Sequence, residues 1–586
     1  MSQNKFSAKI GGIDMSKMSK EVRENRAEAK LHRVTNFMGG SSFELTPLQT
    51  LRLVACSSIF GEPQYYRGTK DRDLKSDHTI DESYDSIIGS RYNGMSTSQV
   101  FEKVIDEALS DDFLGTLEFA KELRRDFYMR LNPQVIMVRA AIHPDRKRFT
   151  DEHPGLFHKI NRDVMRRADE PATQITYYLH LKGDKNKMPS VLKRSIADKL
   201  SSLNAYAVNK YKNSEIGMIN AVRITHAHSA VLDELMKTGK VDVKEDEETW
   251  ERLRSAGMSW RDLTIRQVEN PNFMGHMALL RNLRNIFNAL NETSDIVLAQ
   301  VILKQLVDGV PSGKQFPFRY ESAYDAVKKE DIAFKTMVLD ALEECLDASI
   351  DNLPKLKGKT IALSDNSGSA WGAFTSEYGT KVVAEIDNLS AVIAAKCADM
   401  GEVGAFGDRL KMYPVSKRNG ALIQAKEISS HRGHDVGHAT EGGIWIFFRD
   451  LIDQKKHVDN IFIFSDMQAG TGQLYGEGAI FEEYVKRGFR AADRGIGYSR
   501  YSSSTWFSSR RCVDVYKLIN AYRAQVNPKV NVFCVQTAGY TNTIMPILSY
   551  RTAFLAGWTG KEVQFADKYI REWDAIEASK NVLANN

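Results

Sequence analysis

Hydrophobic and polar positions follow a helical period over most of residues 45–350. Apolar residues recur at three-and-four spacing in segments such as TPLQTLRLVACSSIF, FLGTLEFAKELRRDFYMRL and SDIVLAQVILKQLVD, a pattern typical of amphipathic helices. Prolines separate these segments at Pro133, Pro144, Pro189, Pro271 and Pro311. Many amphipathic helices in succession, without strand-like alternation, predict helical hairpins stacked as a solenoid of degenerate repeats.

The pattern changes after residue 357. Short apolar runs (TIALS, NIFIFSD and KVNVFCVQTAG) alternate with helical segments such as TKVVAEIDNLSAVIAAKCADM and RCVDVYKLINAYRAQV. Buried strands that alternate with helices predict an α/β domain with a doubly wound, Rossmann-like parallel sheet. We expect the boundary between the two halves within residues 351–359. In such a sheet, ligands bind at the carboxyl ends of the strands.

Oxygen-bearing side chains gather where two of these strands end. Asp365, Ser367 and Ser369 follow the first strand at alternate positions, and Asp466 ends the strand NIFIFSD. Thr440 lies between them in the chain, in a glycine-rich loop just ahead of a helix. Two carboxylates and three hydroxyls suit Mg²⁺ or Mn²⁺, with one position left for water or an external acidic group. The competing interpretation is that these residues only cap helices and fill turns.

The charge of the chain is unevenly distributed. The net charge is +5, yet residues 121–230 hold 21 Lys and Arg against 11 Asp and Glu, a difference of +10. Six of the 13 histidines also fall in this range. A local basic excess in a nearly neutral protein predicts a binding surface for a polyanion. The alternative is that these lysines and arginines only solvate helix surfaces.

Length and cysteine usage restrict the class of protein. A chain of 586 residues is too long for one hydrophobic core and predicts two or more domains. It has no apolar run long enough to span a membrane, and its N-terminal segment is polar, without the apolar region of a secretory signal. Five scattered cysteines without a CxxC pair favour a reducing compartment, so we expect a cytoplasmic location.

The strand-end motif resembles the metal-ion-dependent adhesion site of the von Willebrand factor A domain. This resemblance implies that the metal contacts come from Asp365, Ser367, Ser369, Thr440 and Asp466. Such domains usually bind ligands rather than catalyse reactions. Asn366 stands where the family commonly has an apolar residue. This difference removes no oxygen ligand, but it bears on how the first loop packs.

The helical half resembles the TROVE module of the Ro autoantigen family. The segment NFMGGSSFELTPLQTLRLVACSSIFGEPQYY, residues 36–66, carries an Asn-x-x-Gly-Gly start, a leucine-rich helix and a Tyr-Tyr pair. AVRITHAHS, residues 221–229, is similar to the Arg-Leu-Ser-His stretch of the family, and ALLRNLRNI, residues 278–286, to its Leu-Leu-Arg-Asn-Leu core. With the A domain following, the resemblance covers nearly the whole chain from about residue 30.

The resemblance implies an all-α, HEAT-like helical-repeat ring (the TROVE module) closed by the A domain. Family members hold single-stranded 3′ ends of defective or structured RNAs in a basic central hole, and bind small noncoding Y RNAs on the outer face. Bacterial relatives are associated with exoribonucleases. The domains expected here are a flexible arm at 1–29, the TROVE module at 30–355 and the A domain at 356–586.

Basic residues and histidines of the helical half are the candidate RNA contacts, because cations bind phosphates and flat side chains stack on unpaired bases. The candidates are Arg139, His143, Lys210, Lys212, Arg223, His226, Arg281 and Arg284. Arg281 has an alternative role as a packing residue of a helix. Residues 486–511 hold seven Lys and Arg against one Asp, interleaved with aromatic residues. This composition predicts either a single-strand-binding loop or a surface insertion with a small aromatic core.

The sequence therefore predicts a non-catalytic, monomeric RNA-binding ring protein whose A domain carries Mg²⁺ or Mn²⁺. Its expected partners are Y-type RNA, single-stranded RNA 3′ ends and an exoribonuclease or other protein, and its expected role is RNA quality control or processing. One alternative is an A-domain adaptor that binds proteins. Another is a metal-dependent nuclease, which is disfavoured because Asp365 and Asp466 are the only firm acidic candidates at the site.

Overall fold

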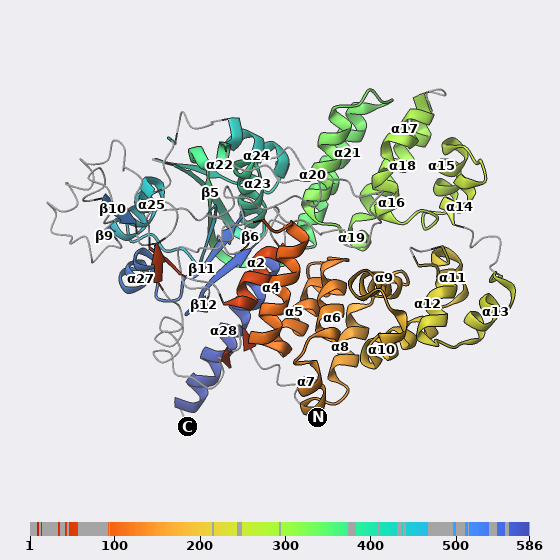
Figure 1. The fold of residues 1–586 in the computed structure, drawn as a ribbon. Coiled ribbons are helices and arrows are strands. Elements are labelled where there is room, and N and C mark those ends of the chain that lie inside the picture. The colour runs from red at the N-terminus through yellow and green to blue at the C-terminus, as the bar shows by residue number, and fades with distance from the viewer. Residues whose placement is uncertain are drawn as a thin grey trace.

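The computed structural model shows a long series of helices followed by an α/β domain (Figure 1). It describes residues 46–56, 94–213, 216–242, 249–291, 295–372, 382–407, 409–430, 441–466, 515–537, 548–556 and 562–584, with short pieces at 9–10, 13–14, 33–35, 41–43, 92, 436–437, 496–499 and 510–513. Within these residues, no helix is long and apolar enough to cross a membrane.

The helical half runs from α2 to α21. Its elements are α2 (Pro47–Cys56), α4 (Thr97–Asp111), α5 (Phe113–Arg125), α6 (Asn132–Ile142), α7 (Arg146–Glu152), α8 (Leu156–Val164), α9 (Glu170–Lys182), the 3₁₀ turn η4 (Lys185–Lys187), α10 (Ser190–Ser201), α11 (Ala205–Tyr211), α12 (Met218–Thr225), α13 (Ala230–Thr238), α14 (Trp250–Ser255), α15 (Trp260–Glu269), α16 (His276–Arg281), α17 (Leu283–Asn291), α18 (Ile296–Asp308), α19 (Val310–Gly313), α20 (Pro317–Lys328) and α21 (Lys335–Asp351).

Local sequence explains where these helices begin and which face they bury. The Ser96 hydroxyl accepts a hydrogen bond from the Gln99 N–H, and the Gln99 side chain accepts one from the Ser96 N–H, so a capping box starts α4. One stripe of α17 is buried at three-and-four spacing: Leu283, Ile286, Phe287 and Leu290. Such stripes are what the hydrophobic period of the sequence predicts.

The α/β domain begins at Leu356, four residues after α21. Its elements are β5 (Leu356–Asp365), α22 (Gly368–Gly372), α23 (Val383–Lys396), β6 (Ala398–Phe406), β7 (Leu410–Pro414), α24 (Ala421–Ser430), α25 (Glu441–Asp453), β8 (Asn460–Ser465), α27 (Val515–Gln525), β11 (Asn531–Gln536), β12 (Leu548–Ser549), β13 (Thr552–Ala556) and α28 (Glu562–Ala584). Short antiparallel pairs lie outside this sheet: β1 (Lys9–Ile10) with β2 (Ile13–Asp14), β3 (Arg33–Thr35) with β4 (Ser41–Phe43), and β9 (Ile496–Ser499) with β10 (Arg510–Val513).

Seven of the described strands form one sheet, in the order β12-β13-β11-β8-β5-β6-β7. The five inner strands are parallel, and β12 and β7 pair antiparallel at the edges. The chain goes from β5 to β6 on one side and then crosses to β8 on the other side. The strand order therefore reverses between β5 and β8, which confirms the predicted doubly wound sheet. Ligands bind such sheets at this reversal, beyond the carboxyl ends of the strands.

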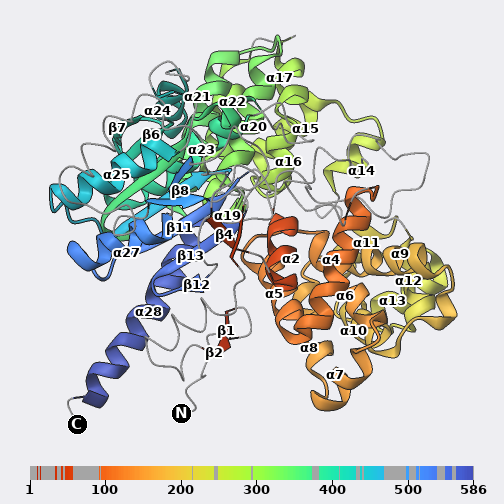
Figure 2. The same ribbon diagram turned by 60° about the vertical axis from the view of Figure 1, so that its left-hand side comes forward.

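Two hydrophobic cores hold the molecule together, and both include part of the α/β domain. The first contains buried residues of α2 to α13 together with Ala370, Val383 and Ala384, and Trp371 packs against it. The second joins α16 to α21 with the sheet and its helices. The α/β domain therefore contacts both the first and the last helices of the series, as the two ribbon views also show (Figures 1 and 2). This arrangement closes the helical series into the ring that the resemblance implies.

Polar contacts reinforce the junction between α21 and the α/β domain. The Lys396 ammonium donates to Asp347 Oδ1 at 2.7 Å and to the Asn419 carbonyl at 2.6 Å. Lys426 lies 4.1 Å from the centroid of the Tyr324 ring in α20.

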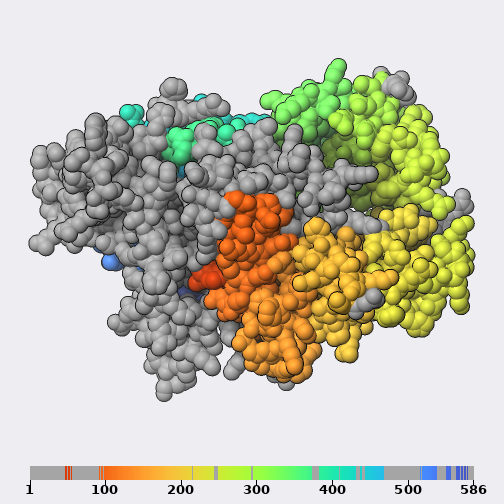
Figure 3. All heavy atoms as spheres, in the orientation of Figure 1, coloured from red at the N-terminus to blue at the C-terminus, as the bar shows by residue number. Residues whose placement is uncertain are grey.

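The surface view places α4 to α13, in orange and yellow, beneath the green helices that follow (Figure 3). These helices present the surface on which a polyanion site was predicted.

Candidate functional site

Asp365 is the last residue of β5 and is fully buried. Its Oδ1 accepts a hydrogen bond from the Ser367 N–H at 2.9 Å, and its Oδ2 accepts one from the Ser465 hydroxyl at 2.6 Å. Ser465 ends β8, the neighbouring strand. The two strand ends are thus tied together at the reversal of the sheet, where the sequence predicts a metal.

The serines and the second acid of the motif lie at the same edge. The Ser367 and Ser369 hydroxyl oxygens are 3.1 Å apart at the start of α22; Ser367 is buried and Ser369 is exposed. Asp466 follows β8 and is 1% exposed. The structure therefore brings four of the five predicted metal contacts to the carboxyl ends of β5 and β8. The fifth, Thr440, lies outside the described residues, immediately before α25.

The environment of Asp365 disfavours a bare negative charge. Burial and, after it, the charge of Asp466 raise the pKa of Asp365 to about 7. The hydrogen bonds from Ser367 and Ser465 act in the opposite direction but do not compensate. A cation at this edge would offset the repulsion between the two carboxylates and favour their ionised forms.

Asp387 is a third buried acid that the sequence analysis missed. It lies in α23 with no exposed surface, and neither carboxylate oxygen forms a hydrogen bond of normal geometry with a described residue. Burial raises the pKa of Asp387 well above its ordinary value, and the charges of Asp365 and Asp466 add to this effect, whereas the Thr537 hydroxyl opposes it. The available signal was an acid inside the apolar helix VAEIDNLSAVIAAK, where a buried charge is costly.

The donor set at this edge fits a hard divalent cation. Carboxylate and hydroxyl oxygens are the ligands that Mg²⁺ and Mn²⁺ prefer. A cation between the two buried acids would reduce their mutual repulsion. The described residues contain no group of three or more His, Cys, Asp or Glu placed to hold a metal together. A cation at this edge would therefore need the serine hydroxyls as well as the two acids, and Asp387 would add negative charge beside them.

Two predicted RNA contacts lie inside the helical half and are already partnered. The Arg139 guanidinium forms an ion pair with Glu102 at 3.3 Å and bonds to Asp106 through Nε at 2.8 Å. His143 is 6% exposed, and its Nε2 lies 3.3 Å from the Ser110 hydroxyl oxygen. These contacts hold α6 against α4, so both side chains have a structural role.

Two further candidates come from α11 and the turn that follows it. The Lys210 ammonium lies 3.9 Å from Glu251 Oε1 and 5.8 Å from the centroid of the Tyr206 ring. Lys212 is half-buried at the end of the helix, where its carbonyl accepts a hydrogen bond from the Met218 N–H at 2.9 Å. Lys212 has its ammonium group available for a ligand, because no ion pair engages it among the described residues.

Arg223 and His226, at the end of α12, are both exposed, and within the described part of the chain neither side chain is paired. His226 ends the helix with a φ of 60°, in the left-handed region that non-glycine residues seldom adopt. A left-handed residue is a common way for a helix to end, so the exposure of the two side chains, rather than the backbone, makes them accessible to a ligand.

Arg281 and Arg284 differ in their surroundings although they are three residues apart. Both are exposed, but Arg284 forms an ion pair with Glu330 at 3.1 Å, whereas Arg281 has no such partner among the described residues. The predicted basic and aromatic segment 486–511 lies mostly outside the described residues; its described residues, 496–499 and 510–511, belong to the paired strands β9 and β10.

The class of protein follows from this geometry: a helical-repeat ring is closed by an A-type α/β domain with carboxylate and hydroxyl groups at the reversal of its sheet. The crystal structure of the Deinococcus radiodurans Ro (RSR) protein is similar to this chain, with a TM-score of 0.50 and 13% sequence identity over 79% of this chain and 93% of the other. This likeness confirms the predicted Ro-type fold. No protein-family model and no curated protein sequence matches the chain.

Proposed function

We propose that this chain is a non-catalytic, Ro-like RNA-binding protein. It binds single-stranded 3′ ends of misfolded or structured RNAs, and small noncoding RNAs of the Y type, in RNA quality control or processing. The observation that carries the proposal is the fold shared with the Ro protein from Deinococcus radiodurans across most of both chains. We further propose that the protein is a cytoplasmic monomer and that it delivers bound RNA to an exoribonuclease.

The charges of the described residues support RNA as the ligand. Arg223, Arg281 and Lys212 are cations without an ion-pair partner in the described parts of the helical half. Such cations bind phosphates by releasing counterions, without reading sequence. His226 beside Arg223 adds a flat side chain that can stack on an unpaired base. Binding of this kind favours flexible single strands and weakens steeply with salt.

The A domain is proposed to carry Mg²⁺ or Mn²⁺, held by Asp365, Ser367, Ser369 and Asp466, with Thr440 as the predicted fifth contact. When bound, the cation supplies positive charge between two buried carboxylates. The chain's own residues fix the position of this charge: Ser465 orients Asp365, and α22 begins directly at the two serines. Because the first hydrophobic core packs on Ala370 and Trp371, this charge also lies next to the closure of the ring.

The test compares a structured RNA bearing a single-stranded 3′ tail with the same RNA made blunt-ended. Binding is titrated at several salt concentrations with Mg²⁺ present, and the RNA is recovered and sized afterwards. Tail-dependent binding that weakens steeply with salt, with the RNA intact, is the expected result. Equal and weak binding of both RNAs would overturn the role in 3′-end recognition and favour an adaptor that binds proteins. Shortening of the RNA would overturn the non-catalytic role.

A further inference from the structure

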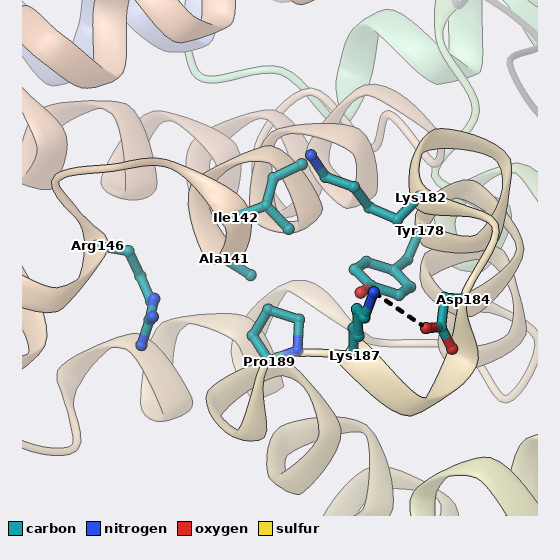
Figure 4. A pocket seen from close by; sticks show the side chains of 8 residues that line it. All are labelled: Ala141, Ile142, Arg146, Tyr178, Lys182, Asp184, Lys187 and Pro189. Carbon is teal, nitrogen blue, oxygen red and sulfur yellow. Dashed lines mark ion pairs between the residues drawn. The ribbon is translucent and has the colours of Figure 1, made fainter.

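A cavity of about 420 Å³ opens among α6, α7, α9, η4 and the start of α10. Its apolar wall is formed by Ala141, Ile142, Pro189 and the buried Tyr178. We call this cavity the Tyr178 pocket. None of its lining residues is among the RNA contacts predicted from the sequence, because the pocket forms only when the ends of α6 and α9 meet the turn at 184–189 (Figure 4).

Three cations surround the apolar wall. Arg146, Lys182 and Lys187 line the pocket together with a single acid, Asp184 (Figure 4). The Lys187 ammonium lies 3.7 Å from Asp184 Oδ2, so these two charges largely offset each other. Arg146 and Lys182 have no ion-pair partner among the described residues. The pocket therefore presents two uncompensated positive charges beside an apolar surface.

The position of Lys182 has a competing, purely structural explanation. Lys182 lies in the last turn of α9, where a cation stabilises the exposed carbonyl groups of a helix end. Arg146 has no such role, because it begins α7. One helix end also does not account for a cavity with apolar walls between the two cations. Two cations facing one cavity from different helices are better explained by an anionic ligand.

Size and chemistry together select the ligand. A cavity of this volume accepts a ligand of small-molecule size and excludes a folded duplex. Its cations suit a phosphate, and its apolar wall suits a flat, weakly polar ring such as a nucleobase. A nucleotide carries both groups at a fixed separation, whereas inorganic phosphate would leave the wall unused and an apolar ligand would leave the cations unused.

We propose that the Tyr178 pocket binds one nucleotide, with its phosphate held by one of the two unpaired cations, Arg146 or Lys182, and its base against the apolar wall of Ile142, Pro189 and Tyr178. This inference rests in part on the proposed function, because an unpaired nucleotide of bound RNA is one source of the ligand. A free mononucleotide is the other source. Both ligands would place a phosphate on a cation and a base on the apolar wall.

The experiment compares the full-length protein with the double variant Arg146→Gln/Lys182→Gln. The control is Lys304→Gln, which removes a cation of α18 that is paired with Asp308 at 2.9 Å. Two ligands are titrated: an unstructured RNA of about 12 nucleotides, within the usual footprint of single-strand sites, and UMP. Thermal unfolding of each variant shows whether the fold is retained. We expect the double variant to bind the RNA about tenfold more weakly, with a smaller salt dependence, and the control to match the native protein.

The two ligands distinguish the sources of the nucleotide. Weaker RNA binding by the double variant, with no binding of UMP, assigns the pocket to an RNA strand. UMP binding that the double variant loses assigns it to free nucleotides as well. If the double variant and the control bind the RNA equally and UMP does not bind, the pocket proposal fails while the proposed RNA-binding function stands. If the native protein binds no RNA, the proposed function fails, and UMP binding alone then decides for or against the pocket.

Discussion

The Ser465 hydroxyl at the end of β8 donates a 2.6 Å hydrogen bond to Oδ2 of Asp365 at the end of β5. These residues are 100 positions apart in the chain, and the bond joins the two strands at the reversal of the sheet. Together with the bond from the Ser367 N–H to Oδ1, it fixes the orientation of the Asp365 carboxylate. Asp365 and Asp466 therefore form a buried acidic edge whose ionisation would respond to a bound cation.

This edge predicts a pH dependence of stability in the metal-free protein. Burial raises the pKa of Asp365 to about 7 and that of Asp387 well above its ordinary value. The folded protein then binds more protons than the unfolded chain, so these groups make the free energy of unfolding fall as pH rises from about 4 towards 7. Added Mg²⁺ should offset this fall, because it favours the ionised carboxylates. Thermal unfolding in EDTA and in Mg²⁺, from pH 5 to 8, measures both effects.

Asp387→Asn separates these acids from every other titrating group. The variant should show a smaller fall in stability with pH than the native protein in EDTA. Asp399→Asn is the matched control, because Asp399 is exposed at the opposite edge of the same sheet, where it accepts the Gly358 N–H. Identical pH profiles for the native protein and Asp387→Asn would show that Asp387 does not titrate against the other two acids.

Arg139 should behave as a structural residue rather than an RNA contact. Arg139→Met leaves Glu102 and Asp106 without their cation, and we expect a loss of about 2–3 kcal/mol in stability because both acids are only partly exposed. Chemical denaturation checks this, with Arg148→Met as the control, since Arg148 is mostly exposed and its ion pair among the described residues is with Asp145, at 3.5 Å. A stable Arg139→Met protein with weakened RNA binding would restore the role predicted from the sequence.

Features that are local in the sequence could be predicted, whereas contacts between distant residues could not. The period of apolar residues and the acids that end β5 and β8 are local features, so the helical half, the sheet and the position of Asp365 could be predicted. The partners of Arg139 could not, because Glu102 and Asp106 lie more than thirty residues away and reach Arg139 only when α4 packs on α6.

Asp387 and the Tyr178 pocket also depend on packing that the sequence does not show. An acid in an apolar helix is expected at the surface, and only the packing of α23 on the sheet brings Asp387 near the charges of Asp365 and Asp466. Lys182 and Arg146 lie in separate helices, and only the packing of α6, α7 and α9 brings them to one cavity. Sequence indicated the excess of positive charge in this region but not which of its cations are unpaired.

His226 offers a test that separates function from stability. Its left-handed backbone costs a non-glycine residue roughly 1 kcal/mol, which glycine does not lose. His226→Gly should therefore be as stable as the native protein or more stable by up to about 1 kcal/mol, yet bind tailed RNA more weakly because the ring is gone. Lys455→Gly, at a similar φ of 51° at the end of α25, controls for the backbone change. Unchanged RNA affinity in His226→Gly would remove this residue from the interface.

Arg281 and Arg284 test whether an existing ion pair withholds a cation from RNA. Arg281→Gln and Arg223→Gln each remove an exposed charge that no described residue pairs, and each should reduce the slope of log affinity against log salt by about 1 if it contacts a phosphate. Arg284→Gln, in the neighbouring helix α17, is matched in exposure and charge, but Glu330 already neutralises it at 3.1 Å, so its effect on the slope should be small. The slopes come from titrations of the tailed RNA at four or more salt concentrations. If Arg284→Gln lowers the slope as much as Arg281→Gln, the phosphate competes successfully with Glu330, and pairing in the free protein no longer predicts which cations bind RNA.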